Sequence, residues 1–382
     1  MKILSVVGAR PNMMKIAPFI RAINLHNKIS QPYIDHFLVH TGQHYDYEMS
    51  NIFFEQLNIL KADRYLKIGS GTHSEQVGET MIEFEKVLEL EKPDWVVLVG
   101  DVNATLACSI TTKKQKIKLC HIEAGLRSND MDMPEEINRL VTDVISDLLL
   151  VPDKFSFRNL IREGKDKNSI KMVGNIMIDS FEQNKAHAKK IDLISIAKKN
   201  INNSNKFVDF SNSDYALITI HRPSNVDNRE KLELIVNFIS EYVLYNLILI
   251  WPMHPRTKKQ LKEFKMWKNL LNNNRIIILN PIGYYEMLKL NLNAKIVFTD
   301  SGGVQEESCV IGTPCLCLRS NTERPITLAE NGGTVHLVDE DLRNLKDIYK
   351  DLINNEKSPN IPEKWDGKTA ARCLDEIINF GN

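Results

Sequence analysis

Short apolar segments alternate with amphipathic segments along most of the chain, and this alternation limits the fold more than any single residue does. Apolar runs of about four to eight residues indicate buried strands, whereas apolar residues at three- and four-residue spacing indicate helices. The first half predicts strands at residues 2–8, 32–40, 94–100 and 117–123, and helices at 12–26, 74–91 and 102–115. This order is typical of βαβ units, so we expect a doubly wound α/β fold with a mostly parallel sheet.

A second alternating series follows a polar stretch, rich in Asn, Ser and Lys, at residues 186–214. Its strands are predicted at residues 215–221, 245–254, 275–280, 294–300, 313–319 and 332–338. A chain of 382 residues is comfortable for two domains, so we place the domain junction in the polar stretch. Ligands of doubly wound sheets bind at the carboxyl ends of the strands, and we expect the motifs of both domains to face a cleft between them.

The composition limits the partners that this chain can have. Lys and Arg together number 49, as do Asp and Glu, which argues against bulk binding of nucleic acid or of an anionic membrane. No apolar run approaches membrane-spanning length, and the first residues read as strand and loop, not as a signal peptide. The six cysteines lie mostly in apolar or helical contexts, as in reduced proteins. We therefore expect a cytoplasmic protein with no nucleic-acid or membrane partner.

Basic and hydrogen-bonding residues follow the first two predicted strands. Gly8 permits a sharp exit into a helix, and Arg10 and Lys15 either offset the two charges of a diphosphate or form a solvated basic pair. Segment 40–46 places several polar groups, His44 among them, in one loop at a strand end, which favours binding.

Three carboxylates of the first half lie at strand or helix ends: Asp101, Glu123 and Glu135. Asp101 either caps the helix that follows or stays ionised there as a base or an electrostatic partner. Glu135 and Glu136 follow a proline, which is also an ordinary way to begin a helix. Convergence of these carboxylates on the cleft would suit acid–base chemistry.

The second half contains strand-end motifs that suit an anion. His221 and Arg222 end one predicted strand, and His254 and Arg256 end the next, which favours anion binding. Rossmann fingerprints, Walker loops and metal-ligand patterns are absent from the sequence. We therefore expect no cofactor and no metal.

Segment 298–308, FTDSGGVQEES, runs from a strand into a helix. Ser301, Gly302 and Gly303 begin that helix, and glycines let backbone N–H groups approach a diphosphate without an intervening side chain. Glu306 or Glu307, one turn along, can accept both hydroxyl protons of a ribose. An ordinary strand–turn–helix connection is the alternative explanation.

In combination, these motifs resemble those of the non-hydrolysing UDP-N-acetylglucosamine 2-epimerase family. GARPxxxK, HTGQHYD, GDVNAT, HIEAGLR, MPEEINR, IHRPSN, HPRT, DSGGVQEE and NTERP occur in the family's order over nearly the whole chain. The resemblance implies the GT-B fold, with Rossmann-like domains at 1–180 and 190–363 and a C-terminal helix at 364–382 that packs back on the first domain. It also implies a UDP-sugar substrate, a UDP site mainly in the second domain, and a homodimer.

The resemblance also implies roles for individual residues. Ser301, Gly302 and Gly303 would cradle the diphosphate, Glu307 would bind the ribose, and Arg10 would contact a phosphate. Segment 281–287, with Ile282 and Tyr285, would lie at the uracil. The other substrate-binding residues implied are His44, Arg222, His254 and Arg324, and the catalytic set is Lys15, Asp101, Glu123, Glu135 and His221.

The chemistry of C2 inversion is consistent with these groups. The C2 hydrogen of an N-acetylhexosamine is not next to a carbonyl, so removal of the C2 proton has to be coupled to departure of UDP from C1. UDP then adds back to the glucal after protonation at the opposite face. We expect an epimerase that interconverts UDP-N-acetylglucosamine and UDP-N-acetylmannosamine. The alternatives are a UDP-2,3-diacetamido-uronate 2-epimerase, a hydrolysing UDP-N-acetylglucosamine 2-epimerase, a GT-B glycosyltransferase and a non-catalytic sugar-nucleotide-binding protein.

Overall fold

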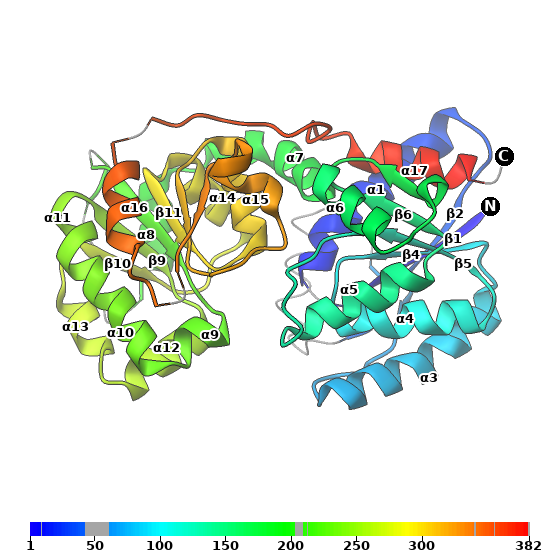
Figure 1. Ribbon diagram of the computed structural model, residues 1–382, viewed down its shortest axis with the longest axis horizontal. Coiled ribbons are helices and arrows are strands. Elements are labelled where there is room, and N and C mark those ends of the chain that lie inside the picture. Colours follow the sequence, from blue (N-terminus) through cyan, green and yellow to red (C-terminus); the bar gives the residue numbers. More distant parts are fainter. Residues whose placement is uncertain are drawn as a thin grey trace. The chain divides into compact units, whose positions relative to one another are not determined.

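The chain forms two compact units in a computed structural model (Figure 1). The structure describes residues 1–8, 10–42, 61–202, 209–211, 213–339, 341–354 and 356–380, without the side chains of residues 10 and 11. The first unit comprises Met1–Phe181 and Pro362–Asn382, and the second comprises Glu182–Ile361. The first unit is therefore built from two separate stretches of the chain.

The first unit contains a parallel sheet whose described strands have the order β3-β2-β1-β4-β5-β6-β7. The strands are β1 (Lys2–Val7), β2 (Asp35–His40), β3 (Arg64–Tyr65), β4 (Trp95–Val99), β5 (Lys118–Ile122), β6 (Leu148–Val151) and β7 (Ile170–Met172). Strand β1 pairs with both β2 and β4, so the order reverses there. Loops that leave β1 and β4 diverge at such a switch point and leave room for a ligand.

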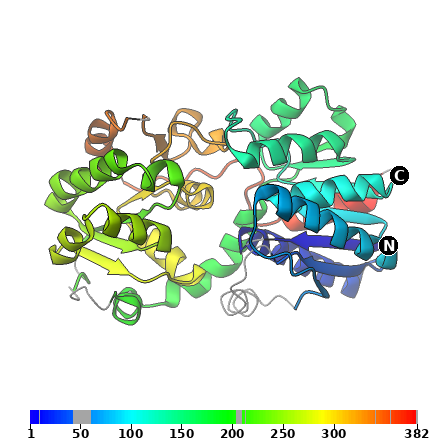
Figure 2. The ribbon, with the colours of Figure 1, turned by 90° about the horizontal axis from the view of Figure 1, so that it is seen from below.

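Helices cover both faces of this sheet (Figures 1 and 2). The helices of the unit are α1 (Arg10–Ile29), α3 (His73–Glu91), α4 (Asn103–Lys114), α5 (Pro134–Ile145), α6 (Lys154–Arg162), the start of α7 (Ile176–Lys190) and α17 (Thr369–Asn379). Figure 1 shows α17, in red, beside α1, in blue, whereas α3, α4 and α5 lie on the other face. Because both faces are covered, strand β4 is apolar and buried at every position.

The second unit repeats this architecture with the described strand order β10-β9-β8-β11-β12-β13, all parallel. The strands are β8 (Tyr215–Thr219), β9 (Ile248–Pro252), β10 (Ile276–Leu279), β11 (Ile296–Thr299), β12 (Cys315–Cys317) and β13 (Val335–Leu337). The helices are α8 (Leu193–Asn200), α9 (Pro223–Val226), α10 (Arg229–Phe238), α11 (Leu244–Asn246), α12 (Pro255–Glu263), α13 (Trp267–Asn272), α14 (Tyr284–Asn293), α15 (Gly302–Ile311) and α16 (Leu345–Leu352). The switch point of this sheet lies between β8 and β11.

Alternate strand residues of the second sheet point into two separate apolar cores. Ile218, Phe298 and Leu316 belong to one core, which α10, α12, α13 and α16 complete. Their neighbours Val297 and Cys315 belong to the other, which α8 and α14 complete. This two-residue period is the geometry of a strand, and it explains why these segments are apolar throughout.

The strands predicted from the sequence are present, and the polar stretch 186–214 is more regular than its composition indicates. It contains the end of α7 and all of α8, which starts at an Asp192 N-cap. The boundary between the units falls between Phe181 and Glu182, inside α7. Among the described residues, no helix is long and apolar enough to cross a membrane.

The C-terminal segment is attached to the rest of the first unit by directed hydrogen bonds. The Asp179 carboxylate of α7 accepts from the backbone nitrogens of Thr369 (3.0 Å) and Ala370 (2.7 Å) at the start of α17. The indole nitrogen of Trp365 donates to the carbonyl of Pro152. Asp179 therefore caps a helix that is about 190 residues away along the chain.

We predict that Asp179→Ala lowers the free energy of unfolding by about 1–3 kcal/mol, because two buried N–H groups lose their acceptor. Urea unfolding would measure this loss, and limited proteolysis should release the C-terminal segment earlier. Asp179→Asn keeps one acceptor oxygen and should lose less. Equal stability of the wild type and Asp179→Ala would contradict the capping role.

Candidate active site

Lys15 and Glu123 meet at the switch point of the first sheet. Lys15, buried on α1, contacts Glu123 Oε2 through its ammonium group. Gly100, after β4, has a left-handed φ of +74°, and a Cβ there would lie 3.3 Å from Lys15 Nζ and 3.6 Å from Glu123 Oε2. The glycine therefore lets the end of β4 approach this ion pair.

The Glu123 carboxylate is available for a ligand on one side. The residue is 4% exposed and has a left-handed φ of +71°, which is uncommon outside glycine. Within the described part of the chain, its Oε1 atom has no hydrogen-bond partner. Buried carboxylate oxygens rarely lack a donor, and such exceptions concentrate at functional sites.

Asp101 is held by Arg139 of helix α5. Arg139 Nη1 donates to Asp101 Oδ2 at 2.6 Å, and Arg139 Nη2 donates to Glu136 Oε2 at the same distance. The Asp101 carbonyl also accepts from Asn138 (2.8 Å). Asp101 therefore has a fixed backbone and an ion pair, and its side chain remains partly accessible.

The two glutamates at the start of α5 differ in their environments. Glu136 is buried and accepts hydrogen bonds from the backbone and hydroxyl of Ser128 and from Arg139. Burial acts to raise the pKa of Glu136, but these hydrogen bonds and the Arg139 charge lower it overall. The half-buried Glu135 forms no hydrogen bond or ion pair with the described residues. The Glu136 carboxylate thus holds Ser128 and Arg139 in place, whereas the Glu135 carboxylate remains available for a ligand.

In the second unit, Asp300 orients His221 at the switch point between β8 and β11. His221 Nδ1 lies 3.0 Å from Asp300 Oδ1. Asp300 is fully buried and also accepts from the backbone nitrogens of His221 and Arg222 and from Asn225. Burial acts to raise the pKa of Asp300, but His221 and these donors lower it overall.

The His221 side chain is 43% exposed, so the Asp300 contact leaves the rest of its ring accessible. Asp300 was not among the site residues predicted from the sequence. The available signal was its position directly after the apolar strand β11.

The Ser301-Gly302-Gly303 segment begins helix α15, with Ser301 at the N-cap position. A Cβ on Gly302 would lie 2.6 Å from Arg324 Nη1 and 3.1 Å from Glu323 Oε1. Gly302 is therefore required for Arg324 to reach the start of this helix, where backbone N–H groups favour an anion.

The charge of Arg324 is balanced by two buried carboxylates. Its Nε donates to Glu306 (2.6 Å), and its Nη1 contacts Glu323, which also pairs with Arg319 (2.9 Å). Burial acts to raise the pKa of Glu323, but the neighbouring arginines hold it well below its usual range. Glu306 is therefore occupied by Arg324, which leaves Glu307 as the other acid of this helix.

Glu307 lies against Tyr284 and Asn291 of helix α14, and burial raises its pKa to about 7 although these two side chains act to lower it. Its role at a ribose stays a prediction. Tyr285 of the same helix packs its ring against His187, 4.4 Å between centroids. Ile282 packs against the neighbouring apolar core.

The remaining residues that were predicted to bind the substrate lie in different environments. Arg222 donates to the Asp300 carbonyl (3.2 Å), and His254 caps α12 while its ring lies 5.4 Å from that of His221. Arg256, expected in the anion site, pairs instead with Asp227 (2.5 Å). The Arg10 side chain and all of His44 lie outside the described residues. No group of three or more His, Cys, Asp and Glu side chains in the described ranges is arranged to hold a metal ion.

The fold and these residues define a two-unit α/β protein with a glycine-rich helix start and paired acidic and basic side chains at the strand ends. The model of the UDP-N-acetylglucosamine 2-epimerase family matches residues 27–378. A UDP-N-acetylglucosamine 2-epimerase of Methanocaldococcus jannaschii is 44% identical, with 100% of both chains covered. A UDP-2,3-diacetamido-2,3-dideoxy-D-glucuronate 2-epimerase of Pseudomonas aeruginosa is 38% identical, covering 85% of this chain and 84% of the relative.

The structure of the M. jannaschii UDP-GlcNAc 2-epimerase in complex with UDP-GlcNAc and UDP has a TM-score of 0.87 to this chain. It is 42% identical and covers 100% of both chains. This chain belongs to the UDP-N-acetylglucosamine 2-epimerase family and is an epimerase. The GT-B two-domain α/β fold that the sequence predicted is confirmed.

Glu307 should make the stability of the protein depend on pH. Its pKa is about 7 in the folded state against about 4.5 in the unfolded chain. Between these values the unfolded chain ionises first, so folding becomes less favourable as pH rises, by up to about 3 kcal/mol. Below pH 4.5 both states are neutral, and above pH 7 both are charged.

We therefore predict that Glu307→Gln, which cannot ionise, becomes more stable relative to the wild type as pH rises from 4.5 to 7. Thermal unfolding at a series of pH values would measure this difference. The exposed Glu330→Gln serves as a control, with a difference that stays constant across the series. A Glu307→Gln difference that is equally constant would refute the buried environment of Glu307.

Proposed function

We propose that this enzyme interconverts UDP-N-acetylglucosamine and UDP-N-acetylmannosamine by elimination and re-addition of UDP. The observation that carries this proposal is the buried Glu123. One of its oxygens pairs with Lys15, and the other has no partner among the residues that the structure describes. A carboxylate held in this way can accept or donate a proton at a bound sugar. The M. jannaschii relative, crystallised with UDP-GlcNAc and UDP, supports the choice of substrate.

The proposed reaction has two half-steps. In the first, a carboxylate takes the C2 proton, a C1–C2 double bond forms, and the C1–O bond breaks with its electron pair on the diphosphate. In the second, a proton is added at the opposite face of C2, and a diphosphate oxygen attacks C1. Asp101 and Glu123 are the proposed proton carriers, and Glu135 is the third carboxylate available to them.

The second unit supplies the groups that hold the leaving group in this proposal. The start of α15, with Gly302 and Arg324, suits a diphosphate that gains charge as C1–O breaks. Asp300 holds His221 Nδ1, so the exposed side of the ring can donate to a phosphate oxygen. Tyr285 and Ile282 are proposed at the uracil and Glu307 at the ribose, on the strength of the family resemblance.

A homodimer is the proposed assembly. Ile137 and Val144 of α5, two turns apart and therefore on one side of the helix, are 44% and 60% exposed. A second copy of the chain would remove these side chains from water. Sedimentation equilibrium should give twice the mass of one chain, and a monomer would contradict the proposal.

The cytoplasm is the proposed compartment. All six cysteines are free and buried, which matches a reducing environment. Burial raises the pKa of the Cys108 and Cys120 thiols well above the usual value, so neither is activated for disulfide exchange.

Reaction in heavy water tests the elimination mechanism. The wild type, given UDP-N-acetylglucosamine, should form UDP-N-acetylmannosamine that carries deuterium at C2, because the abstracted proton is replaced from solvent. Proton NMR would follow the C2 signal, and some UDP and 2-acetamidoglucal should accumulate. Protium alone at C2, with no glucal, would exclude this mechanism.

The same assay separates the alternative activities. A hydrolysing enzyme would release free N-acetylmannosamine, a uronate epimerase would turn over only the diacetamido-uronate nucleotide, and a glycosyltransferase would need an acceptor. Glu123→Gln provides the control variant. It should slow exchange at C2 by about a hundredfold or more while still binding UDP, because it removes a proton carrier without altering the second unit.

A further inference from the structure

A buried pair, His121 and Asp143, lies behind the carboxylates of the first unit. His121 belongs to β5 and Asp143 to α5, and both side chains are almost fully buried. His121 Nδ1 lies 2.6 Å from Asp143 Oδ1, and His121 Nε2 lies 2.9 Å from the carbonyl oxygen of Gly100. None of the reaction steps above uses either residue.

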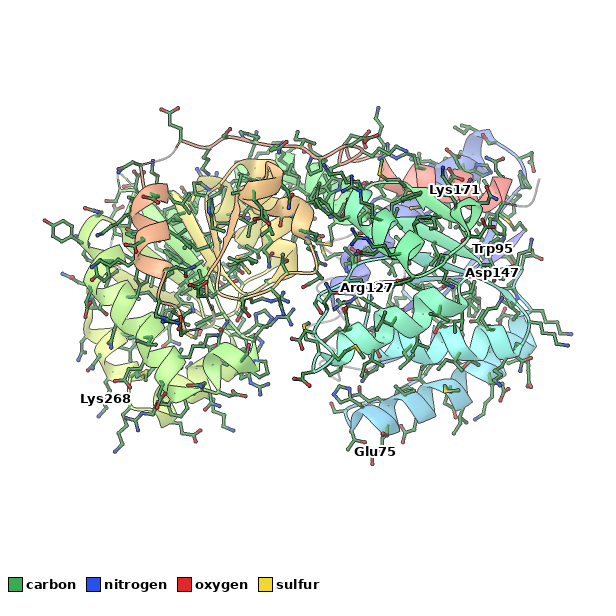
Figure 3. The ribbon with its side chains drawn as sticks, in the orientation of Figure 1. Glu75, Trp95, Arg127, Asp147, Lys171 and Lys268 are labelled. Atoms are coloured by element: carbon green, nitrogen blue, oxygen red, sulfur yellow. The ribbon has the colours of Figure 1, made fainter. Side chains whose placement is uncertain are left out.

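Asp143 also holds the loop after Glu123. Its Oδ2 atom accepts from the backbone nitrogen of Gly125 (2.9 Å) and lies 2.7 Å from Arg127 Nη1. Arg127 in turn pairs with Glu163 (2.7 Å; Arg127 is labelled in Figure 3). Burial acts to raise the pKa of Asp143, but His121, Arg127 and the Gly125 N–H lower it overall. Asp143 is therefore a carboxylate with hydrogen-bond donors at both of its oxygens.

The two loops joined by this pair carry Asp101 and Glu123. Gly100 directly precedes Asp101, and Gly125 lies two residues after Glu123. Both glycines and Glu123 have left-handed φ angles of 71–79°. A Cβ on Gly125 would lie 2.4 Å from the carbonyl of Ser156, so only glycine fits at this position of the loop. Its conformation depends on the contacts that hold it.

We propose that Asp143 and His121 are positioning residues that fix the Asp101 and Glu123 carboxylates relative to each other. The pair joins the backbone before Asp101 to the backbone after Glu123 through hydrogen bonds of 2.6–2.9 Å. Arg139, one turn before Asp143 on the same face of α5, holds the Asp101 side chain. Asp143 and Arg139, on one face of α5, thus position both the backbone and the side chain of Asp101.

The geometry also gives each ring nitrogen of His121 an acceptor to face. The Asp143 carboxylate lies at Nδ1 and the Gly100 carbonyl lies at Nε2, so in the proposed arrangement each ring nitrogen donates one hydrogen bond. A ring with a single N–H group would leave one of these two oxygens without its His121 donor. The positioning role therefore has a spectroscopic signature that does not depend on activity.

Kinetics of Asp143→Asn test the positioning role, which rests on the proposed function for its activity readout. The amide of this variant keeps the shape of the Asp143 carboxylate, but it places an NH₂ group against the donors of His121, Gly125 and Arg127. We expect kcat, expressed per UDP-binding site, to fall by about a hundredfold, because a small misplacement of reacting groups has effects of this size. The UDP dissociation constant should be unchanged. An unchanged kcat would overturn the proposal.

Asp147→Asn is the matched control (Asp147 is labelled in Figure 3). Asp147 accepts from the backbone nitrogen of Leu119 (2.7 Å) at the opposite end of the same strand β5 and pairs with Lys113. It should retain normal kcat, since it touches neither carboxylate loop. An equal fall of kcat in both variants would mean that strand β5 is merely destabilised, and would overturn the proposal.

NMR of wild-type protein labelled with ¹⁵N-histidine tests the proposal even if Asp143→Asn fails to fold. Each ring nitrogen of His121 should give the signal of a hydrogen-bonded N–H group, with the signals assigned by their loss in His121→Gln. Absence of either N–H group would overturn the proposal. This result is independent of the reaction, so a wild type that shows both N–H groups but does not epimerise would refute the proposed function alone.

Discussion

The parallel pairing of β1 with β4, and of β8 with β11, is the constraint on which the rest of this structure depends. A parallel sheet sends the carboxyl ends of its strands to one edge, and the loops diverge only where the strand order reverses. Each unit places its chemistry at that position. Lys15, Glu123 and Asp101 lie at the first switch point, and His221 and Asp300 at the second.

Charged groups at both switch points are compensated inside their own unit. Lys15 pairs with Glu123, Arg139 with Asp101, and Arg324 with Glu306 and Glu323. Burying a single charge is expensive, whereas a paired and hydrogen-bonded charge is tolerated. The site is therefore rigid before a ligand binds, which is what electrostatic stabilisation of a transition state requires. It also follows that an anion at α15 meets backbone N–H groups more than an excess of positive side chains.

The sequence was sufficient for β1, β2, β4 and β5, for the described strands of the second sheet and for most strand-end residues, because apolar periodicity and glycine placement are local signals. The short strands β3, β6 and β7 were not predicted. Which of those strand-end residues pair with one another could not be predicted from such local signals. That Lys15 meets Glu123 depends on how α1 crosses the sheet, and that Asp143 meets His121 depends on the register between α5 and β5. Arg256 was expected in the anion site from its position, but it forms an ion pair with Asp227, which lies two residues before α10. The burial of Glu307 against helix α14 was likewise not predictable from local signals.

The discontinuity of the first unit has a consequence for synthesis on the ribosome. Helix α17, which follows the second unit in the chain, buries Cys373, Leu374 and Ile377. The second unit is one continuous stretch, so it can finish folding while the first still lacks its closing helix. Until α17 emerges, the face of α1 that it covers stays in water and the Asp179 carboxylate has no helix to cap. Completion of the unit that contains Glu123 therefore waits until the segment that forms α17 has been translated, after the whole of the second unit.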